Sequence, residues 1–294
     1  MEIAQRLMEW YAETARPFPW RTQPPDPYIV LLSEMMLQQT QASRVAALLP
    51  VFLESYPTIH HLAAATNGEI IRHWKGLGYN SRALRLRDAA RAIVDEHQGL
   101  VPASVEELRA LPGVGPYTSA AIACFAYNVY AVVLDVNVRR VYSRITRPQE
   151  TTVDVEDDSV LYDVARTLIP QGAPSKWHHA VMDLGATICT SRSPQCSSCP
   201  LTEICPSSGI MRSAPRPKRS EPMFRGEPRR IWRGRVVEHL RHVGQRGITE
   251  SALVKSILGV EASDEEREWL RALVTVLERD GVVSQRGRRI SLAD

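Results

Sequence analysis

The chain has 294 residues, with 36 lysines and arginines against 33 aspartates and glutamates, for a formal net charge of +3. The composition is 44% hydrophobic and 23% charged, typical of a globular protein of one or two domains with a substantial core. So small a positive charge does not by itself establish a nucleic-acid partner. No apolar run reaches the roughly 18 residues of a membrane span, and the N-terminus lacks a signal-peptide core, so we expect a cytoplasmic protein without membrane contact.

The first 205 residues predict consecutive amphipathic helices joined by short connections. Apolar residues recur with a period near 3.6 in Ile70–Trp74, Ala83–Val94 and Val105–Leu111. The best strand candidate is Val129–Asp135, which we interpret as a loop or helix end because helices are predicted on both sides. An all-α fold is therefore expected for domain 1–205.

The character of the chain changes after residue 205. Residues 206–228 contain five prolines, several basic residues and little periodicity, which predicts a linker. Residues 229–294 predict a small second domain. Its expected elements are three helices, within 231–243, 248–258 and 264–281, and a hairpin, 282–292, that turns at Arg286-Gly287. Three helices followed by a two-stranded wing is the order of a winged-helix domain.

Four of the five cysteines lie close together in a loop, 189–205, with the spacing Cys189-x6-Cys196-x2-Cys199-x5-Cys205. Thiolates this close can surround one ion or cluster, and they suit zinc or iron–sulfur. Zinc sites more often use two CxxC pairs, whereas this loop has one, which favours an iron–sulfur cluster. The fifth cysteine, Cys124, lies in an apolar stretch and is interpreted as a core residue.

The connection LPGVG, Leu111–Gly115, joins two predicted helices. Gly113 and Gly115 permit a tight turn, and Pro116 suits the first turn of the following helix. Exposed backbone N–H groups at such a helix start can bind one DNA phosphate without reading its base. This is the helix-hairpin-helix pattern; an ordinary helical hairpin is the alternative.

Two carboxylates, Glu34 and Asp135, occupy sequence positions that are unusual for residues on the surface. Glu34 has apolar helical neighbours in Val30, Leu31 and Leu37, so burial should raise its pKa and keep it protonated near neutral pH. Asp135 falls at a predicted helix N-cap, where capping hydrogen bonds should keep it ionised. One protonated and one ionised acid can cleave a glycosidic bond. The alternatives are a solvent-facing glutamate and a purely structural cap.

Several motifs then occur in a recognisable order: PFPWR (17–21), LSEMMLQQTQ (32–41), GLGY (76–79), LPGVGPYT, LDVNVRR, MDLGATICT and the four-cysteine loop. With these motifs, over about 210 residues, the chain resembles the helix-hairpin-helix DNA glycosylases, and most of all the A/G-specific adenine DNA glycosylase (MutY type) family. The resemblance implies a bilobed all-helical fold and a [4Fe–4S] cluster held by Cys189, Cys196, Cys199 and Cys205. It further implies a monomeric, nucleoid-associated base-excision repair enzyme. Such an enzyme flips an adenine mispaired with 8-oxoguanine or guanine out of double-stranded DNA and hydrolyses its N-glycosidic bond.

The resemblance also implies residue roles. Glu34 matches the acid that protonates the adenine, Asp135 matches the carboxylate that stabilises the sugar cation, and Tyr117 and Asn137 match residues that support them. Trp20 and Arg21 match the wall of the base pocket, and four residues match those that fill or probe the opened DNA stack: Gln39, Thr40, Leu77 and Tyr79. The other residues matched to DNA or base contacts are Gly113, Gly115, His179 and Met182. Related bifunctional lyases carry a nucleophilic lysine where this chain has Tyr117. A phenol cannot form their Schiff base, so we expect weak or no strand cleavage.

Two features depart from the family pattern. His179 stands where family members place a glutamate or glutamine against the adenine edge; its protonation would make recognition pH-dependent, or its ring only packs between helices. The winged-helix-like tail replaces the Nudix-like domain that reads the 8-oxoguanine strand in many members, and resembles actinobacterial-type versions. Its wing arginines, Arg286, Arg288 and Arg289, either contact DNA or form a solvated turn.

Two other functions stay open at this point. A thymine or uracil mismatch glycosylase on the same scaffold also uses a tyrosine at the hairpin; Glu34 and the run Gln38–Thr40 favour adenine. A non-catalytic iron–sulfur regulator could bind DNA through the winged helix. The paired carboxylates Glu34 and Asp135 argue against it, because a binding module needs neither.

Overall fold

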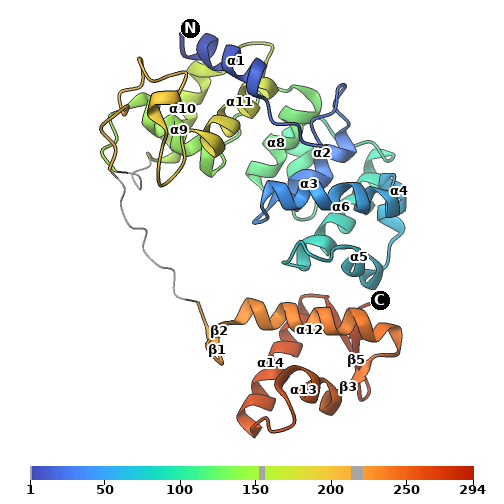
Figure 1. Cartoon of the computed structure of the whole chain (residues 1–294). Coiled ribbons are helices and arrows are strands. Elements are labelled where there is room, and N and C mark those ends of the chain that lie inside the picture. The colour runs from blue at the N-terminus through green and yellow to red at the C-terminus, as the bar shows by residue number, and fades with distance from the viewer. Residues whose placement is uncertain (1, 152–155, 213–220) are drawn as a thin grey trace. The chain divides into compact units, whose positions relative to one another are not determined.

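The computed structural model describes residues 2–151, 156–212 and 221–294, and helices dominate it (Figure 1). The predicted linker, 206–228, lies partly outside the described residues, at 213–220. The chain forms two compact units. One contains residues 1–34, 101–110 and 114–218, and the other contains residues 35–100, 111–113 and 219–294. Among the described residues, no helix is both long and apolar enough to cross a bilayer.

The first unit is built of helices around a buried core. Trp177, Tyr142 and Leu7 are fully buried, and the Trp177 indole donates to the Tyr142 hydroxyl at 2.8 Å. Residues 128–135 form no strand, as predicted. The helices are α1 (Glu2–Thr14), α2 (Pro27–Leu37, which ends in the other unit), α7 (Val105–Ala110), α8 (Pro116–Tyr127), α9 (Val136–Thr146), α10 (Asp158–Leu168), α11 (Pro174–Thr187) and the short η1 (Cys196–Ser198).

The second unit begins with four helices and ends with the C-terminal elements. The four are α3 (Ala42–Ser55), α4 (Ile59–Ala64), α5 (Asn67–His73) and α6 (Ser81–His97). Capping is strong here: the Thr66 hydroxyl accepts from the Glu69 amide, and the Glu69 carboxylate accepts from the Thr66 amide. This capping box is the local reason that α5 begins where it does.

Three helices and a wing follow near the C-terminus, in the predicted order. They are α12 (Arg229–Val243), α13 (Glu250–Leu258), α14 (Asp264–Arg279), β4 (Val283–Arg286) and β5 (Arg289–Leu292), with η2 at Gly244–Arg246. The short strand β3 (Ile248–Thr249) completes an antiparallel sheet of order β3-β5-β4, in which Ile290 opposes both Ile248 and Gln285. Within the predicted linker range, β1 (Met223–Phe224) pairs with β2 (Glu227–Pro228).

Candidate active site

Glu34 lies on α2 in an apolar setting. Its side chain is only 5% exposed, and the adjacent Leu31 and Leu32 are fully buried. The Tyr117 hydroxyl donates a hydrogen bond to its carboxylate. Burial raises the pKa of Glu34 to about 8, and the negative charge of Asp135 adds to the rise. The predicted proton donor is therefore protonated near neutral pH.

Asp135 is the N-cap of α9, as predicted. Its carboxylate accepts from the backbone amides of Asn137 and Val138, at 2.9 and 2.6 Å, and from the Asn137 side chain at 3.1 Å. These bonds were expected to keep Asp135 ionised. The pKa of Asp135 is nevertheless raised above its usual value, because burial outweighs the hydrogen bonds and the positive charge of Arg140. The ionised state of Asp135 stays a prediction.

The two acids still differ in what stabilises their anions. Two close buried carboxylates cannot both ionise at low cost, so one proton is best shared unequally between them. Asp135 accepts three N–H bonds and lies near a guanidinium, whereas Glu34 accepts one phenol. The anion is therefore better stabilised on Asp135 and the proton on Glu34.

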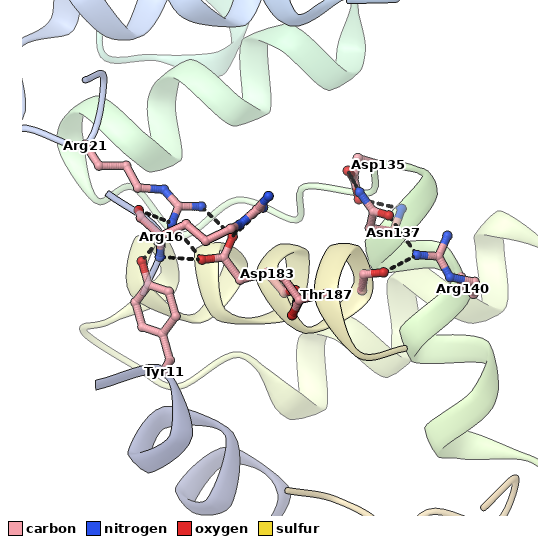
Figure 2. Close-up of polar contacts among 9 residues, drawn as sticks. Tyr11, Arg16, Arg21, Asp135, Asn137, Arg140, Asp183 and Thr187 are labelled. Atoms are coloured by element: carbon pink, nitrogen blue, oxygen red, sulfur yellow. Dashed lines mark hydrogen bonds and ion pairs between the residues drawn. The ribbon is translucent and has the colours of Figure 1, made fainter. Parts of the chain in front are cut away.

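Arg140 lies close to Asn137 (Figure 2) and connects it to the cysteine loop. Its guanidinium donates to the Asn137 side-chain oxygen at 2.7 Å, the Gly185 carbonyl at 2.6 Å and the Cys189 carbonyl at 2.8 Å. Gly185 is required here, since an added Cβ would lie 2.7 Å from the Asn137 Cβ. Arg140 was part of the motif LDVNVRR, yet sequence reasoning gave it no role.

The four predicted metal ligands, Cys189, Cys196, Cys199 and Cys205, line one pocket. The buried Arg144 also lines it, and its Nη1 lies 3.3 Å from the Cys189 sulfur. The Nε and Nη2 atoms of Arg144 have no partner within the described parts of the chain. Four thiols and a buried cation with unused donors fit an anionic iron–sulfur cluster, whose thiolates and sulfides accept hydrogen bonds.

The hairpin between α7 and α8 has the geometry predicted for it. Gly113 has a φ of +76°, and a Cβ there would lie 2.7 Å from the Cβ of Arg85. Gly115 is the N-cap of α8; it makes no side-chain cap, and a Cβ on it would meet open space. The start of α8 therefore presents backbone N–H groups without a capping side chain, although phosphate binding there stays a prediction.

Arg21 and Trp20 are held by neighbours in the first unit. The Arg21 guanidinium forms a bidentate pair with Asp183, at 2.8 and 2.9 Å, and Arg16 donates to the same carboxylate at 2.7 Å (Figure 2). Trp20 stacks on Phe18 with ring centroids 4.5 Å apart. These contacts fix both side chains; their predicted place in the base pocket wall stays a prediction.

The residues predicted to probe the DNA stack differ in their exposure. Gln39 and Tyr79 are exposed, Tyr79 at 51%, and both have left-handed backbones with φ of 57° and 45°. Such strain in non-glycine residues is common at functional sites. Leu77 is only 5% exposed in the protein alone, and its contact with DNA stays a prediction. Its carbonyl accepts a hydrogen bond from Thr40, at 3.2 Å.

Comparison with known proteins agrees with this geometry. Residues 32–160 match the HhH-GPD superfamily base excision DNA repair proteins, and residues 189–205 match the iron–sulfur binding domain of endonuclease III. Over 239 residues the chain is 39% identical to the adenine DNA glycosylase of Mycobacterium tuberculosis, covering 80% of this chain and 77% of that protein. The chain belongs to the adenine DNA glycosylase family. The match at 189–205 identifies the cysteine loop as a [4Fe–4S] site.

In other relatives, the match covers a smaller share of the relative's own length. The enzyme of Mycolicibacterium smegmatis is 42% identical over 67% of this chain and 66% of that protein. The human enzyme is 38% identical over 68% of this chain and 38% of that protein. Among solved structures, a thermostable thymine-DNA glycosylase has a TM-score of 0.64 at 30% identity, covering 70% of this chain and 94% of its own. A non-covalent endonuclease III–DNA complex has a TM-score of 0.60 at 25% identity, covering 70% and 92%.

His179, the departure from the family pattern, is neutral in the folded protein. Its ring stacks on Phe125, with centroids 4.3 Å apart and planes 12° from parallel. Burial, and secondarily the positive charge of Arg21, lower its pKa to about 3. His179 therefore does not titrate near neutral pH, and recognition through it is expected to be pH-independent there. Met182 is partly buried against the core of the same unit.

Arg82 is the main residue near the predicted site that sequence reasoning missed. It is buried, and its Nη1 donates to the carbonyls of Met35 and Met36 at the end of α2, at 3.0 and 2.9 Å. Its Nη2 donates to the Thr40 hydroxyl at 3.0 Å and the Leu77 carbonyl at 2.8 Å. Arg82 thus joins the end of α2 to the two segments that carry the exposed residues Gln39 and Tyr79.

Arg82 also stacks on the rings of Trp74 and Tyr79, at 5.4 and 5.6 Å. Burial lowers its pKa to about 10, which leaves it charged at neutral pH. The available signal was its place in the motif GLGYNSR, three residues beyond Tyr79.

Replacing Arg82 with methionine should lower the free energy of unfolding by about 2–4 kcal/mol, because several buried carbonyls lose a charged donor. Arg82→Lys should not restore the lost stability, because a single ammonium group cannot reach all the acceptors that the two guanidinium nitrogens contact. Urea unfolding measures both. The exposed Arg85, one position beyond Leu84 on α6, gives the control variant Arg85→Met, which should stay within about 0.5 kcal/mol. Equal losses in both variants would contradict the role of Arg82.

Proposed function

We propose that this protein removes adenine mispaired with 8-oxoguanine or guanine from double-stranded DNA, acting as a monofunctional, monomeric glycosylase of base-excision repair in the nucleoid-containing cytoplasm. The observation that carries the proposal is a buried carboxyl, Glu34, whose pKa is raised to about 8 beside a second carboxylate, Asp135. Family membership supports adenine as the base, since the relatives at 39% and 42% identity are adenine DNA glycosylases.

In the proposed mechanism the flipped adenine accepts the proton of Glu34 at a ring nitrogen and becomes a better leaving group. Tyr117 donates to Glu34 and so orients it. The bond between the base and the sugar then breaks, and positive charge develops on the sugar. Asp135 lies in the same site to stabilise that charge, with its own orientation fixed by Asn137 and the start of α9. Water adds to the sugar carbon and loses a proton, which gives the abasic site.

The cluster loop contributes structure to this site. A [4Fe–4S] cluster on Cys189, Cys196, Cys199 and Cys205 would hold the loop closed and could supply electron transfer. Arg140 joins this loop to the site, because it donates hydrogen bonds to both the Cys189 carbonyl and the Asn137 side chain. Because the position that matches the lyase lysine is Tyr117, the proposed reaction ends at an abasic site without strong strand cleavage.

The proposal is tested with a panel of duplexes that differ in one base pair. Purified protein should release adenine from 8-oxoguanine:A and G:A duplexes, detected by alkaline cleavage of the abasic product. The same product left at neutral pH should stay uncut, which tests the absence of lyase activity. Release of thymine or uracil with no release of adenine would overturn the substrate assignment.

A thymine mismatch glycosylase remains the second candidate, because a solved thymine-DNA glycosylase is 30% identical with a TM-score of 0.64. His179, in place of an acidic or amide side chain, is the feature of this chain that fits it best. The same panel, with G:T and G:U duplexes added, separates the two functions.

A further inference from the structure

The C-terminal elements contact the loop that follows α5. Glu238, on α12, forms an ion pair with Lys75 at 2.6 Å, at the start of this loop. Arg241, one turn later on α12, donates to the Asn80 side-chain oxygen at 2.9 Å, at the end of the loop. The segment Lys75–Asn80 is therefore held at both ends by one helix of the C-terminal domain. Exposed Tyr79 lies between these two contacts.

Arg241 is positioned by several acceptors. Its Nε and Nη2 donate to the carbonyl of Ile71, in the last turn of α5, at 3.1 and 3.0 Å, and its Nη1 donates to Glu238 at 2.9 Å. Asn80 precedes the first residue of α6 but makes no side-chain cap there, so its oxygen is used for Arg241 instead. Arg241 is thus a link between the end of one helix and the start of the next.

A second group of contacts packs the start of α5 against the C-terminal residues. Asn67, at the start of α5, donates to the carbonyl of Gly281 at 3.3 Å. Gly68 is buried against the C-terminus: a Cβ there would lie 3.0 Å from Asp294 and 3.1 Å from the carbonyl of Ala293. A larger residue at position 68 would have to displace this end of the chain.

We propose that the C-terminal domain, residues 229–294, is a brace that sets the position of the Lys75–Asn80 loop, and that Arg241 is its principal positioning residue. Its role is in mispair recognition through Tyr79, and in this respect it rests on the proposed function. The domain holds the loop through α12, and the wing arginines Arg286 and Arg288 take no part in these contacts. Proton transfer by Glu34 does not depend on the brace.

The first test needs no DNA. Hydrogen–deuterium exchange of the full-length protein compares Arg241→Met with Arg233→Met. The control removes an ion pair of the same domain, Arg233–Asp280 at 2.7 Å, without touching the loop. In Arg241→Met, peptides that cover residues 75–80 should exchange about tenfold faster, and in Arg233→Met they should exchange as in the unchanged protein. Equal protection of these peptides in all three proteins would overturn the brace.

The second test uses DNA. Arg241→Met should bind an 8-oxoguanine:A duplex about tenfold more weakly and unstack a neighbouring 2-aminopurine less. Its single-turnover rate at saturating enzyme should stay within about twofold, a split that general destabilisation would not produce. Arg241→Lys should recover part of the affinity. Loss of affinity in an Arg286→Gln/Arg288→Gln variant, with none in Arg241→Met, would assign the domain to direct DNA contact. If the unchanged protein neither binds nor cleaves a mispair, the proposed function fails, and the exchange result still decides the brace.

Discussion

Replacing Glu34 with glutamine should reduce adenine release by about 10³-fold while mispair binding stays within about threefold. Glutamine keeps the shape and the contact with Tyr117 but has no acidic proton to transfer to the base. Single-turnover cleavage and filter binding on an 8-oxoguanine:A duplex measure the two effects separately. A Glu34→Gln protein that cleaves at the normal rate would remove Glu34 from the role of general acid.

The same variant should be more stable than the unchanged protein at alkaline pH. Glu34 has a usual pKa of 4.5, which applies to the unfolded chain, and a pKa of about 8 when folded. Protonation therefore favours folding, and the unchanged protein loses stability as the pH rises from about 4.5 to about 8. The difference should reach on the order of 3–5 kcal/mol at pH 8.

Thermal unfolding of both proteins at pH 5 and pH 8 checks this difference. The two proteins should be nearly equal in stability at pH 5 and clearly separated at pH 8. A constant offset at both pH values would mean that packing, and not ionisation of Glu34, causes the difference.

Replacing Asp135 with asparagine should lower the rate of base release by about 10²–10³-fold with little change in fold. Asparagine caps a helix about as well as aspartate, so α9 should still begin at Val136, while the charge that stabilises the sugar cation is gone. Single-turnover kinetics measure the rate. The control is Asp135→Ala, which should lose about 1 kcal/mol of stability in addition, because the cap itself is removed.

This variant also reports on Glu34. The negative charge of Asp135 is one of the causes of the raised pKa of Glu34, so that pKa should fall below about 8 in Asp135→Asn. Infrared titration of the carboxyl band follows the change. An unchanged Glu34 titration would show that burial alone sets its pKa and that the two carboxylates are not coupled.

Much of this site could be predicted from sequence because its chemistry follows from local patterns. A lone acid at apolar helical spacing predicted the burial of Glu34, and a helix start predicted the cap at Asp135. Cysteine spacing placed four thiols around one cavity. Each of these rules depends on residues within a few turns of one another in the chain.

The features that sequence reasoning missed depend on residues far apart in the chain. Arg82 contacts carbonyls about 46 residues before it, and Arg241 contacts Ile71, which lies 170 residues earlier. Backbone carbonyls have no sequence signature, so their use by a buried arginine cannot be read from composition or spacing. The upward shift in the pKa of Asp135 was not predicted for a related reason: the cap is local, whereas the burial that outweighs it is set by tertiary packing.

The hydrogen bonds of Arg82 bear on how such an enzyme tells a mispair from a normal pair. They fix the segments that carry Gln39 and Tyr79, so in the proposed enzyme these side chains would act on DNA as a rigid wedge. When the wedge does not yield, the cost of inserting it falls on the duplex, and that cost depends on how tightly the local base pairs stack. A mismatched pair already stacks and pairs poorly, so it opens at a smaller cost than its neighbours. In the proposed enzyme, a rigid protein would therefore favour mispairs through their lower cost of opening, before any side chain contacts the base itself.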